Sequence, residues 1–219
     1  MIDAAWRPSR LVVASGNAHK VRELRAMLSD VAGLEVVGQR DFGDPPEIEE
    51  TEDTFVGNAR LKAEGIAAWL RGQGEAGDTV VLADDSGVCV DALDGGPGVR
   101  SARFAGEPSD DEANNARLVR ELEARDLAQS PGHYRCVLAL VRVDAQPFAD
   151  AQEPMAAFDG RWDVELRTTR QGTGGFGYDP HAWLSDGRTV AELADEEKAA
   201  QSHRGHAMRG LLAWLRSDA

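Results

Sequence analysis

The chain has 219 residues, 42% hydrophobic and 28% charged, so it can bury a substantial core and has the composition of an ordinary globular protein. Asp and Glu outnumber Lys and Arg by 38 to 24, and the formal charge of -14 argues against a polyanionic partner such as duplex DNA. No apolar run approaches the roughly 20 residues of a membrane helix, and residues 1–10 lack a signal-peptide pattern. We therefore expect a cytoplasmic protein without a nucleic acid polymer or a membrane among its partners.

Apolar patterns alternate between strand and helix along the chain. Apolar runs predict strands at residues 11–14, 34–37, 79–83, 134–143 and 158–169. Helical spacing predicts helices from Ala18, from a cap at Asp53 or Thr54 through Leu70, over 110–124 and over 203–215. Because the middle strands are joined by short loops, we expect a mixed α/β protein rather than an all-parallel one. Cys89 and Cys136 lie in apolar stretches, so we expect buried thiols.

Loops and turns separate these elements. The acidic segment 41–53 contains Pro45-Pro46, which excludes a helix or a central strand there. Further turn or loop patterns lie at 84–87, where the preceding strand is expected to stop, at 95–98, at 147–154 and at 172–177.

A candidate phosphate site follows the first strand, in the run Ser15, Gly16, Asn17, Ala18, His19 and Lys20. Backbone N–H groups at a helix start suit phosphate, and Lys20 adds a positive charge. The glycine spacing is not that of a P-loop. Alone, the run is also typical of a capped turn with a solvated lysine.

Two acidic segments are candidates for a metal site. Glu47, Glu49 and Glu50 are either solvated, or one or two of them turn toward a hard cation. The sequence does not show which of the three glutamates would do so. Asp84 and Asp85 follow an apolar strand, so we expect them at its C-terminal edge, pointing in different directions. A turn closing a hairpin is the structural alternative. Carboxylates and hydroxyls without a Cys/His cluster favour Mg²⁺ over Zn²⁺.

The last third of the chain carries candidate base-binding residues. Glycines in 172–179 allow close backbone approach, and Phe176 or Tyr178 could stack on a base. A tight turn with its aromatic residues in the core fits the same pattern. His203 and Arg204 could donate hydrogen bonds to carbonyl oxygens of a base, with ordinary surface residues as the alternative.

In this order, the segments resemble the inosine/xanthosine triphosphate pyrophosphatase family, also called Ham1-like. The matching motifs are SGNxxK at 15–20, EETxxTFxxNA at 49–59, Lys62-Ala63, ADDSG at 83–87, VDAL at 90–93, PGV at 97–99, SARF at 101–104, GTGGFGYDP at 172–180, TxAEL at 189–193, Lys198 and SHRG at 202–205. Their joint order and spacing are very specific, and the resemblance spans residues 11–215. The chain departs from the family at Arg100 and Gln201, which leaves the acids and lysines untouched.

The resemblance implies an elongated mixed β-sheet with two α/β lobes and a central cleft. We therefore expect one domain over residues 1–219, with a core of about 10–216, in a protein that is usually a homodimer. The resemblance also implies Mg²⁺-dependent hydrolysis of ITP, dITP and XTP between the α- and β-phosphates.

Carried over residue by residue, Ser15 to Lys20 hold the triphosphate in this resemblance. Asp85 and Glu49 or Glu50 hold the metal, and Asp85 is also the proton acceptor. The implied substrate contacts are Ser86, Phe176, Gly177, Tyr178, Asp179, Lys198, His203 and Arg204.

The residues suggest direct attack by water, since Ser86 has no adjacent base at a recognisable spacing. Donors from His203, Arg204 and loop N–H groups would favour a keto group at C6 of the base over an amino group. Two alternatives stay open. One is a Maf-like pyrophosphatase acting on pyrimidine or methylated nucleotides, and the other is a sensor that binds nucleotide without turnover.

Overall fold

The structure is a computed structural model that describes residues 7–75, 77–146, 148 and 155–216. Residues 147 and 149–154 of the predicted loop lie outside the described residues. Residues 1–6, part of the segment 1–10 that lacks a signal-peptide pattern, also lie outside them. The chain divides into two compact units. Unit 1 comprises Met1–Asp85, Val137–Asp159 and Ala207–Ala219, and unit 2 comprises Ser86–Cys136 and Gly160–His206.

The strands form a mixed sheet in the order β2-β1-β3-β4-β5-β6. Their bounds are β1 Arg10–Ala14, β2 Glu35–Gly38, β3 Thr79–Val90, β4 Gln129–Arg142, β5 Met155–Arg167 and β6 Ala182–Trp183. β1 pairs in parallel with β2 and with β3, whereas β5 and β6 are antiparallel. The helices are α1 Ala18–Leu28, α2 Phe55–Gly72, α3 Asp111–Glu123, α4 Asp195–Gln201 and α5 His203–Arg216. The predicted mixed α/β fold is confirmed.

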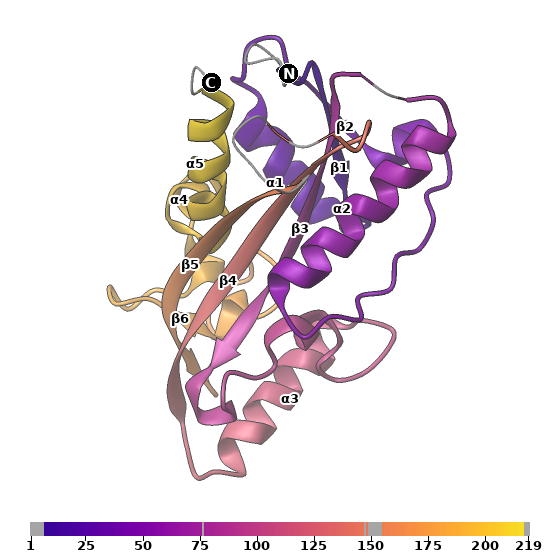
Figure 1. The fold of residues 1–219 in the computed structure, drawn as a ribbon. Coiled ribbons are helices and arrows are strands. Elements are labelled where there is room, and N and C mark those ends of the chain that lie inside the picture. Colours follow the sequence, from indigo (N-terminus) through magenta and orange to yellow (C-terminus); the bar gives the residue numbers. More distant parts are fainter. Residues whose placement is uncertain (1–6, 76, 147, 149–154, 217–219) are drawn as a thin grey trace. The chain divides into compact units, whose positions relative to one another are not determined.

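Unit 1 is built around β1, which has a strand on each side. Leu11, Val12 and Val13 are fully buried, as expected for an apolar run in a central strand. Within this unit α1 contacts β2 and α2 contacts β1 (Figure 1). Thr54 caps α2, because its hydroxyl accepts a hydrogen bond from the N–H of Gly57 at 3.1 Å.

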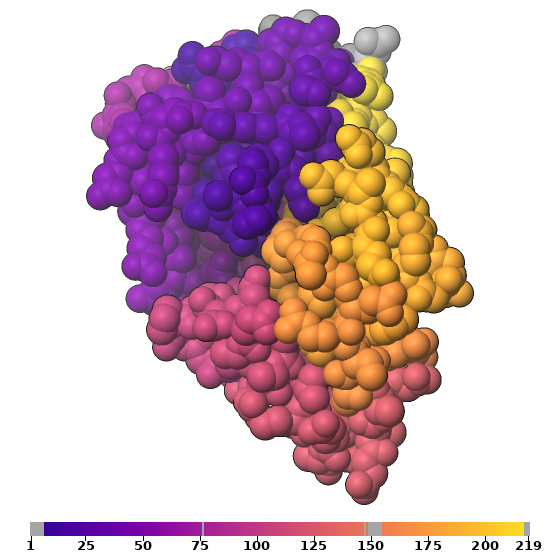
Figure 2. Space-filling model, turned by 180° about the vertical axis from the view of Figure 1, so that it is seen from behind, coloured from indigo at the N-terminus to yellow at the C-terminus, as the bar shows by residue number. Residues whose placement is uncertain are grey.

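Unit 2 packs α3 and the glycine-rich loop around a second apolar core. This core includes Val88, Val90, Leu118, Leu122 and Leu166. The loop is tied to α3 through the backbone of Gly177, which donates to Asp111 and accepts from Asn115. On the face in Figure 2 the pink α3 segment and the orange loop segment lie side by side.

The expected stop at residues 84–87 is wrong, because β3 runs straight through them to Val90. Asp84 and Asp85 are 2% and 5% exposed, and both pair with lysines, so neither needs a solvated turn. Gly87 serves close packing instead, since a Cβ there would lie 2.3 Å from the carbonyl oxygen of Gly98. The two acids therefore lie within a strand and not at its end.

Other boundaries differ less from the predictions. β4 begins at Gln129, before Pro131 and Gly132, which discourage a strand in the sequence pattern. A short helix, α4, precedes the predicted last helix. Cys89 and Cys136 are buried free thiols, as predicted. Among the described residues no helix is both long and apolar enough to cross a membrane.

Candidate functional site

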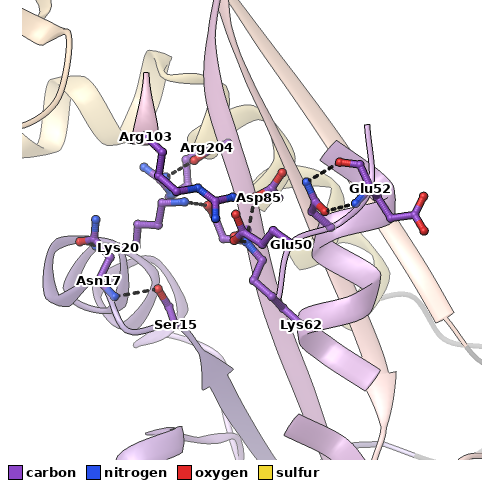
Figure 3. Close-up of polar contacts among 12 residues, drawn as sticks. Ser15, Asn17, Lys20, Glu50, Glu52, Lys62, Asp85, Arg103 and Arg204 are labelled. Carbon is purple, nitrogen blue, oxygen red and sulfur yellow. Dashed lines mark hydrogen bonds and ion pairs between the residues drawn. The ribbon is translucent and has the colours of Figure 1, made fainter. Parts of the chain in front are cut away.

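Unit 1 gathers its acidic candidates around one lysine. The Nζ of Lys62, on α2, lies 2.8 Å from Glu50 Oε1, 2.8 Å from Asp85 Oδ1 and 2.9 Å from the backbone oxygen of Asp84. Figure 3 shows the side chains of Lys62, Glu50 and Asp85 pointing toward one another. The lysine side chain is 16% exposed, so its three acceptors satisfy a largely buried ammonium.

Asp85 combines burial with one unused oxygen. Its Oδ2 is buried and has no hydrogen-bond partner within the described part of the chain. Burial raises the pKa of Asp85 above its usual value, although Lys62 and Lys20 oppose the shift. Burial alone would lower the pKa of Lys62, but Asp85 and Glu50 raise it above the ordinary value. Charged Lys62 therefore lies beside the Asp85 carboxyl group, whose affinity for a proton is raised.

The two neighbouring glutamates differ in their surroundings. Glu50 shares Lys62 with Asp85, whereas the Glu49 residue is exposed. Asn58 fixes the backbone of this loop, because its amide group donates to the Glu52 carbonyl at 3.0 Å and accepts from the Glu52 N–H at 2.9 Å. Residues from α2 therefore set both the path of the acidic loop and the position of the Glu50 carboxylate.

The predicted phosphate segment surrounds the start of α1. Asn17 caps this helix, since its Oδ1 accepts from the N–H groups of His19 at 2.9 Å and Lys20 at 3.3 Å. The Asn17 N–H donates to Ser15 Oγ at 3.2 Å. Lys20 Nζ lies 2.6 Å from Asp84 Oδ1, and the Asp84 side chain is fully buried. As predicted, the adjacent acids point to different partners: Asp84 to Lys20 and Asp85 to Lys62.

The donor set in unit 1 suits a hard cation. Carboxylate oxygens from Asp85 and Glu50 are available, and the buried Oδ2 of Asp85 lacks a protein partner among the described residues. The described residues contain no group of three or more His, Cys, Asp or Glu that could hold a metal ion. Two carboxylates fit Mg²⁺, which is commonly bound by one or two carboxylates together with substrate phosphates.

Unit 2 gathers its candidates around Asp179, which is 4% exposed. Its Oδ2 accepts hydrogen bonds from Lys198 Nζ at 2.8 Å and from the N–H of Phe176 at 2.9 Å. Its Oδ1 accepts from the hydroxyl of Tyr134 at 3.1 Å. A single buried carboxylate thus connects the glycine-rich loop, α4 and β4, with Gly175 close against it.

Cations surround the Phe176 ring in unit 2. Lys198 Nζ lies 4.5 Å and Arg204 Cζ 5.9 Å from the ring centroid. Arg204 is 1% exposed and donates from Nη2 to Ser86 Oγ at 3.1 Å. His203, the residue before Arg204, is also buried, at 6% exposure. Buried donors of this kind suit an anionic or carbonyl-bearing ligand.

Two of the predicted substrate-contact side chains are turned inward. Tyr178 is 5% exposed and donates its hydroxyl to the Ser101 carbonyl at 2.8 Å, and burial raises the pKa of this phenol above its usual value. Asp179 is engaged as described above. Their predicted contacts with substrate stay predictions.

The sequence prediction omitted several residues that organise these clusters. Lys62 was part of a matched motif but not of the predicted site, because a lysine on a helix is typical of a solvated face. The side-chain amides of Asn58 and Asn115 each form hydrogen bonds with the backbone of a loop. Tyr134 lies in an alternating strand pattern, which indicates only a core position. No local sequence signal distinguishes these residues from ordinary structural ones.

The chain is similar to proteins of one family along almost its whole length. The model of the Ham1 family matches residues 11–214. A dITP/XTP pyrophosphatase from Chromobacterium violaceum is 47% identical over 209 residues, covering 95% of this chain and 98% of that protein. A dITP/XTP pyrophosphatase from Shigella flexneri is 42% identical over 209 residues, with 95% and 98% covered.

Solved structures show the same fold. A HAM1 protein from Coxiella burnetii superposes with a TM-score of 0.80 at 36% identity, covering 94% of this chain and 98% of that one. A structure from Mycobacterium abscessus, described as a nucleoside-triphosphatase / dITP/XTP pyrophosphatase, has a TM-score of 0.66 at 36% identity, with 95% and 100% covered.

Proposed function

Since the chain belongs to the Ham1 family, we propose that it hydrolyses the deaminated purine nucleoside triphosphates ITP, dITP and XTP to the monophosphate and pyrophosphate. Relatives that match it along almost their whole length are dITP/XTP pyrophosphatases. The observation that carries the proposal is the buried Asp85 carboxylate, which has one oxygen on Lys62 and the other without a protein partner among the described residues.

We further propose that Asp85 and Glu50 hold Mg²⁺. Glu50 is chosen over Glu49 because it shares Lys62 with Asp85, whereas Glu49 is exposed. A bound Mg²⁺ would offset the negative charge of the polyphosphate and lower the pKa of water. Lys62 keeps the two carboxylates together despite their mutual repulsion.

In the proposed reaction a water oxygen attacks the α-phosphorus, and the bond from that phosphorus to the bridging oxygen breaks. Asp85 accepts the proton of the attacking water, a role that suits a buried carboxylate whose Oδ2 has no hydrogen-bond partner among the described residues. Pyrophosphate leaves with the electron pair of the broken bond. Lys20 contributes positive charge to the triphosphate, and buried Asp84 holds its ammonium in place.

Base selectivity is proposed to rest on donors in unit 2. A keto oxygen at C6 would accept hydrogen bonds from His203 or Arg204, whereas a 6-amino group would place donor against donor. Sites whose buried polar groups go unpaired with the wrong ligand discriminate by about 10⁴–10⁵. ITP and XTP carry the keto group, and ATP carries the amino group.

The proposal is tested by incubating the protein with ITP, XTP, GTP, ATP and dTTP in the presence of Mg²⁺ and measuring pyrophosphate. We expect release from ITP and XTP well above that from ATP. Preference for dTTP would instead support a Maf-like activity on pyrimidine nucleotides. Binding of ITP without pyrophosphate release would support a nucleotide sensor.

We also propose a homodimer in the cytoplasm, on the family resemblance and on the free nucleotides that the proposed reaction consumes. Size-exclusion chromatography with light scattering tests the dimer. A mass about twice that of the chain is expected, and a mass equal to that of one chain would contradict it.

A further inference from the structure

One buried tyrosine contacts His203, which is proposed to serve base recognition, and Asp179, which is among the expected substrate contacts. Tyr134 is 6% exposed and lies on β4. Its ring stacks on the His203 imidazole, with centroids 4.9 Å apart and planes inclined by 11°. Its hydroxyl donates to Asp179 Oδ1 at 3.1 Å. Tyr134 therefore acts on His203 through its ring and on Asp179 through its hydroxyl.

The hydrogen bond from the Tyr134 hydroxyl determines which oxygen of the Asp179 carboxylate binds the glycine-rich loop. With Oδ1 held by Tyr134, Oδ2 accepts from the N–H of Phe176 and from Lys198 Nζ. Burial and the neighbouring Asp179 carboxylate raise the pKa of the Tyr134 phenol well above its usual value. The phenol thus stays protonated and remains a donor.

The backbone of the loop is shaped to this arrangement. Gly175 has a φ of +72°, and a Cβ at this position would lie 2.1 Å from Asp179 Oδ2. Any larger residue would push the carboxylate off the oxygen position that receives Phe176 and Lys198. The orientation of Asp179 is therefore set by Gly175 at one oxygen and by Tyr134 at the other.

The stack has a separate consequence for His203. A nearly parallel ring at this distance restricts rotation of the imidazole, which fixes the direction of its N–H groups.

We propose that Tyr134 is a positioning residue for base selectivity, acting through His203 by stacking and through Asp179 by hydrogen bonding. The inference rests on the proposed function, because it names the residue that aligns the donors of that site. Tyr134 does not touch the substrate in this proposal.

The competing explanation is that Tyr134 is only a core residue, since it packs with Leu122 and other apolar side chains. The two explanations differ in one measurable quantity. Loss of packing lowers the fraction of active protein, which reduces the rate with every substrate equally. Loss of positioning changes the ratio of kcat/KM for ITP to kcat/KM for ATP, which does not depend on the active fraction.

The experiment compares the parent protein with Tyr134→Phe, Tyr134→Leu and Leu122→Val. Tyr134→Phe keeps the ring and removes the hydroxyl, and we expect the ITP-to-ATP ratio to fall about threefold to tenfold, the usual worth of one hydrogen bond. Tyr134→Leu also removes the stack and should lower the ratio further. Leu122→Val, a matched change in the same core, should lower thermal stability and leave the ratio unchanged.

An unchanged ratio in both Tyr134 variants would overturn the positioning role, even if their rates fall. Turnover of ITP by the parent protein tests the proposed function separately. The ratio of the Kd values of ITP and ATP, measured by calorimetry on an Asp85→Asn background, reports base discrimination in the ground state without turnover. These measurements therefore distinguish a failure of the positioning role of Tyr134 from a failure of the proposed hydrolysis.

Discussion

Replacing Lys62 by Met should destabilise the protein through the two carboxylates that it leaves behind. Lys62 contacts Glu50 and Asp85 at 2.8 Å, and their side chains are 25% and 7% exposed. Removing one partner of a buried ion pair costs about 3–5 kcal/mol, whereas exposed pairs contribute about 0–1 kcal/mol. Because Glu50 is partly solvated, we expect a loss of about 2–3 kcal/mol.

This loss corresponds to a fall in Tm of about 4–12 °C for a chain of this size. The proposed metal site predicts a second effect. Mg²⁺ would supply the positive charge that the Lys62→Met variant lacks, so saturating Mg²⁺ should raise the Tm of the variant more than that of the parent. Thermal unfolding followed by circular dichroism, with and without Mg²⁺, measures both effects.

Arg10 provides a matched control, because it also bridges two carboxylates, Glu35 at 2.8 Å and Glu75 at 3.1 Å. Its side chain is 36% exposed, so Arg10→Met should cost less than about 1 kcal/mol and show no specific response to Mg²⁺. Equal losses of unfolding free energy in the Lys62 and Arg10 variants would contradict the effect of burial on the Lys62 ion pairs. Equal Tm shifts with Mg²⁺ in the parent and in Lys62→Met would contradict the proposed metal site.

Three further predictions concern Asp85, Lys62 and Gly175. Asp85→Asn should lower kcat by at least about 10²–10⁴ through loss of the base and of a proposed metal ligand, while nucleotide affinity measured by calorimetry without Mg²⁺ is largely kept, and near-full activity would exclude the base role. Lys62 lowers the raised pKa of Asp85, so in the metal-free protein Lys62→Met should raise the pKa of this carboxyl group further, as followed by its carboxyl ¹³C shift in an NMR titration; an unchanged or lower pKa contradicts this. Gly175→Ala combines strain at φ +72° with the clash on Asp179, whereas Gly177→Ala at φ +62° meets no atom within 4 Å. Strain alone costs about 1–2 kcal/mol, so Gly175→Ala should lower Tm more, and equal Tm values would contradict the close contact.

Much of the fold follows from local patterns. The apolar run of β1 and a cap of α2 at Asp53 or Thr54 are both visible in the sequence, because burial and capping depend on neighbouring residues, and the structure shows Thr54 as the cap. The continuation of β3 through residues 84–87 cannot be predicted from the local sequence. Asp84 and Asp85 are typical turn residues, and the lysines that neutralise them come from α1 and α2, which only the tertiary structure brings close.

The site divides in the same way. The adjacency of Asp84 and Asp85 predicts that they face different directions, and they do pair with different lysines. The choice between Glu49 and Glu50 depends on how an extended loop is held against α2 by Asn58 and Lys62, which no local pattern reveals. Tyr134 shows the same limit, since its partners lie far along the chain.

In the proposed reaction, water attacks the α-phosphorus of a deaminated purine nucleoside triphosphate. Hydrolysis of ITP in ¹⁸O-labelled water with Mg²⁺, followed by mass spectrometry of both products, tests it most directly. We expect one ¹⁸O atom in the monophosphate and none in the pyrophosphate. Label in the pyrophosphate, or release of inorganic phosphate in its place, would contradict it.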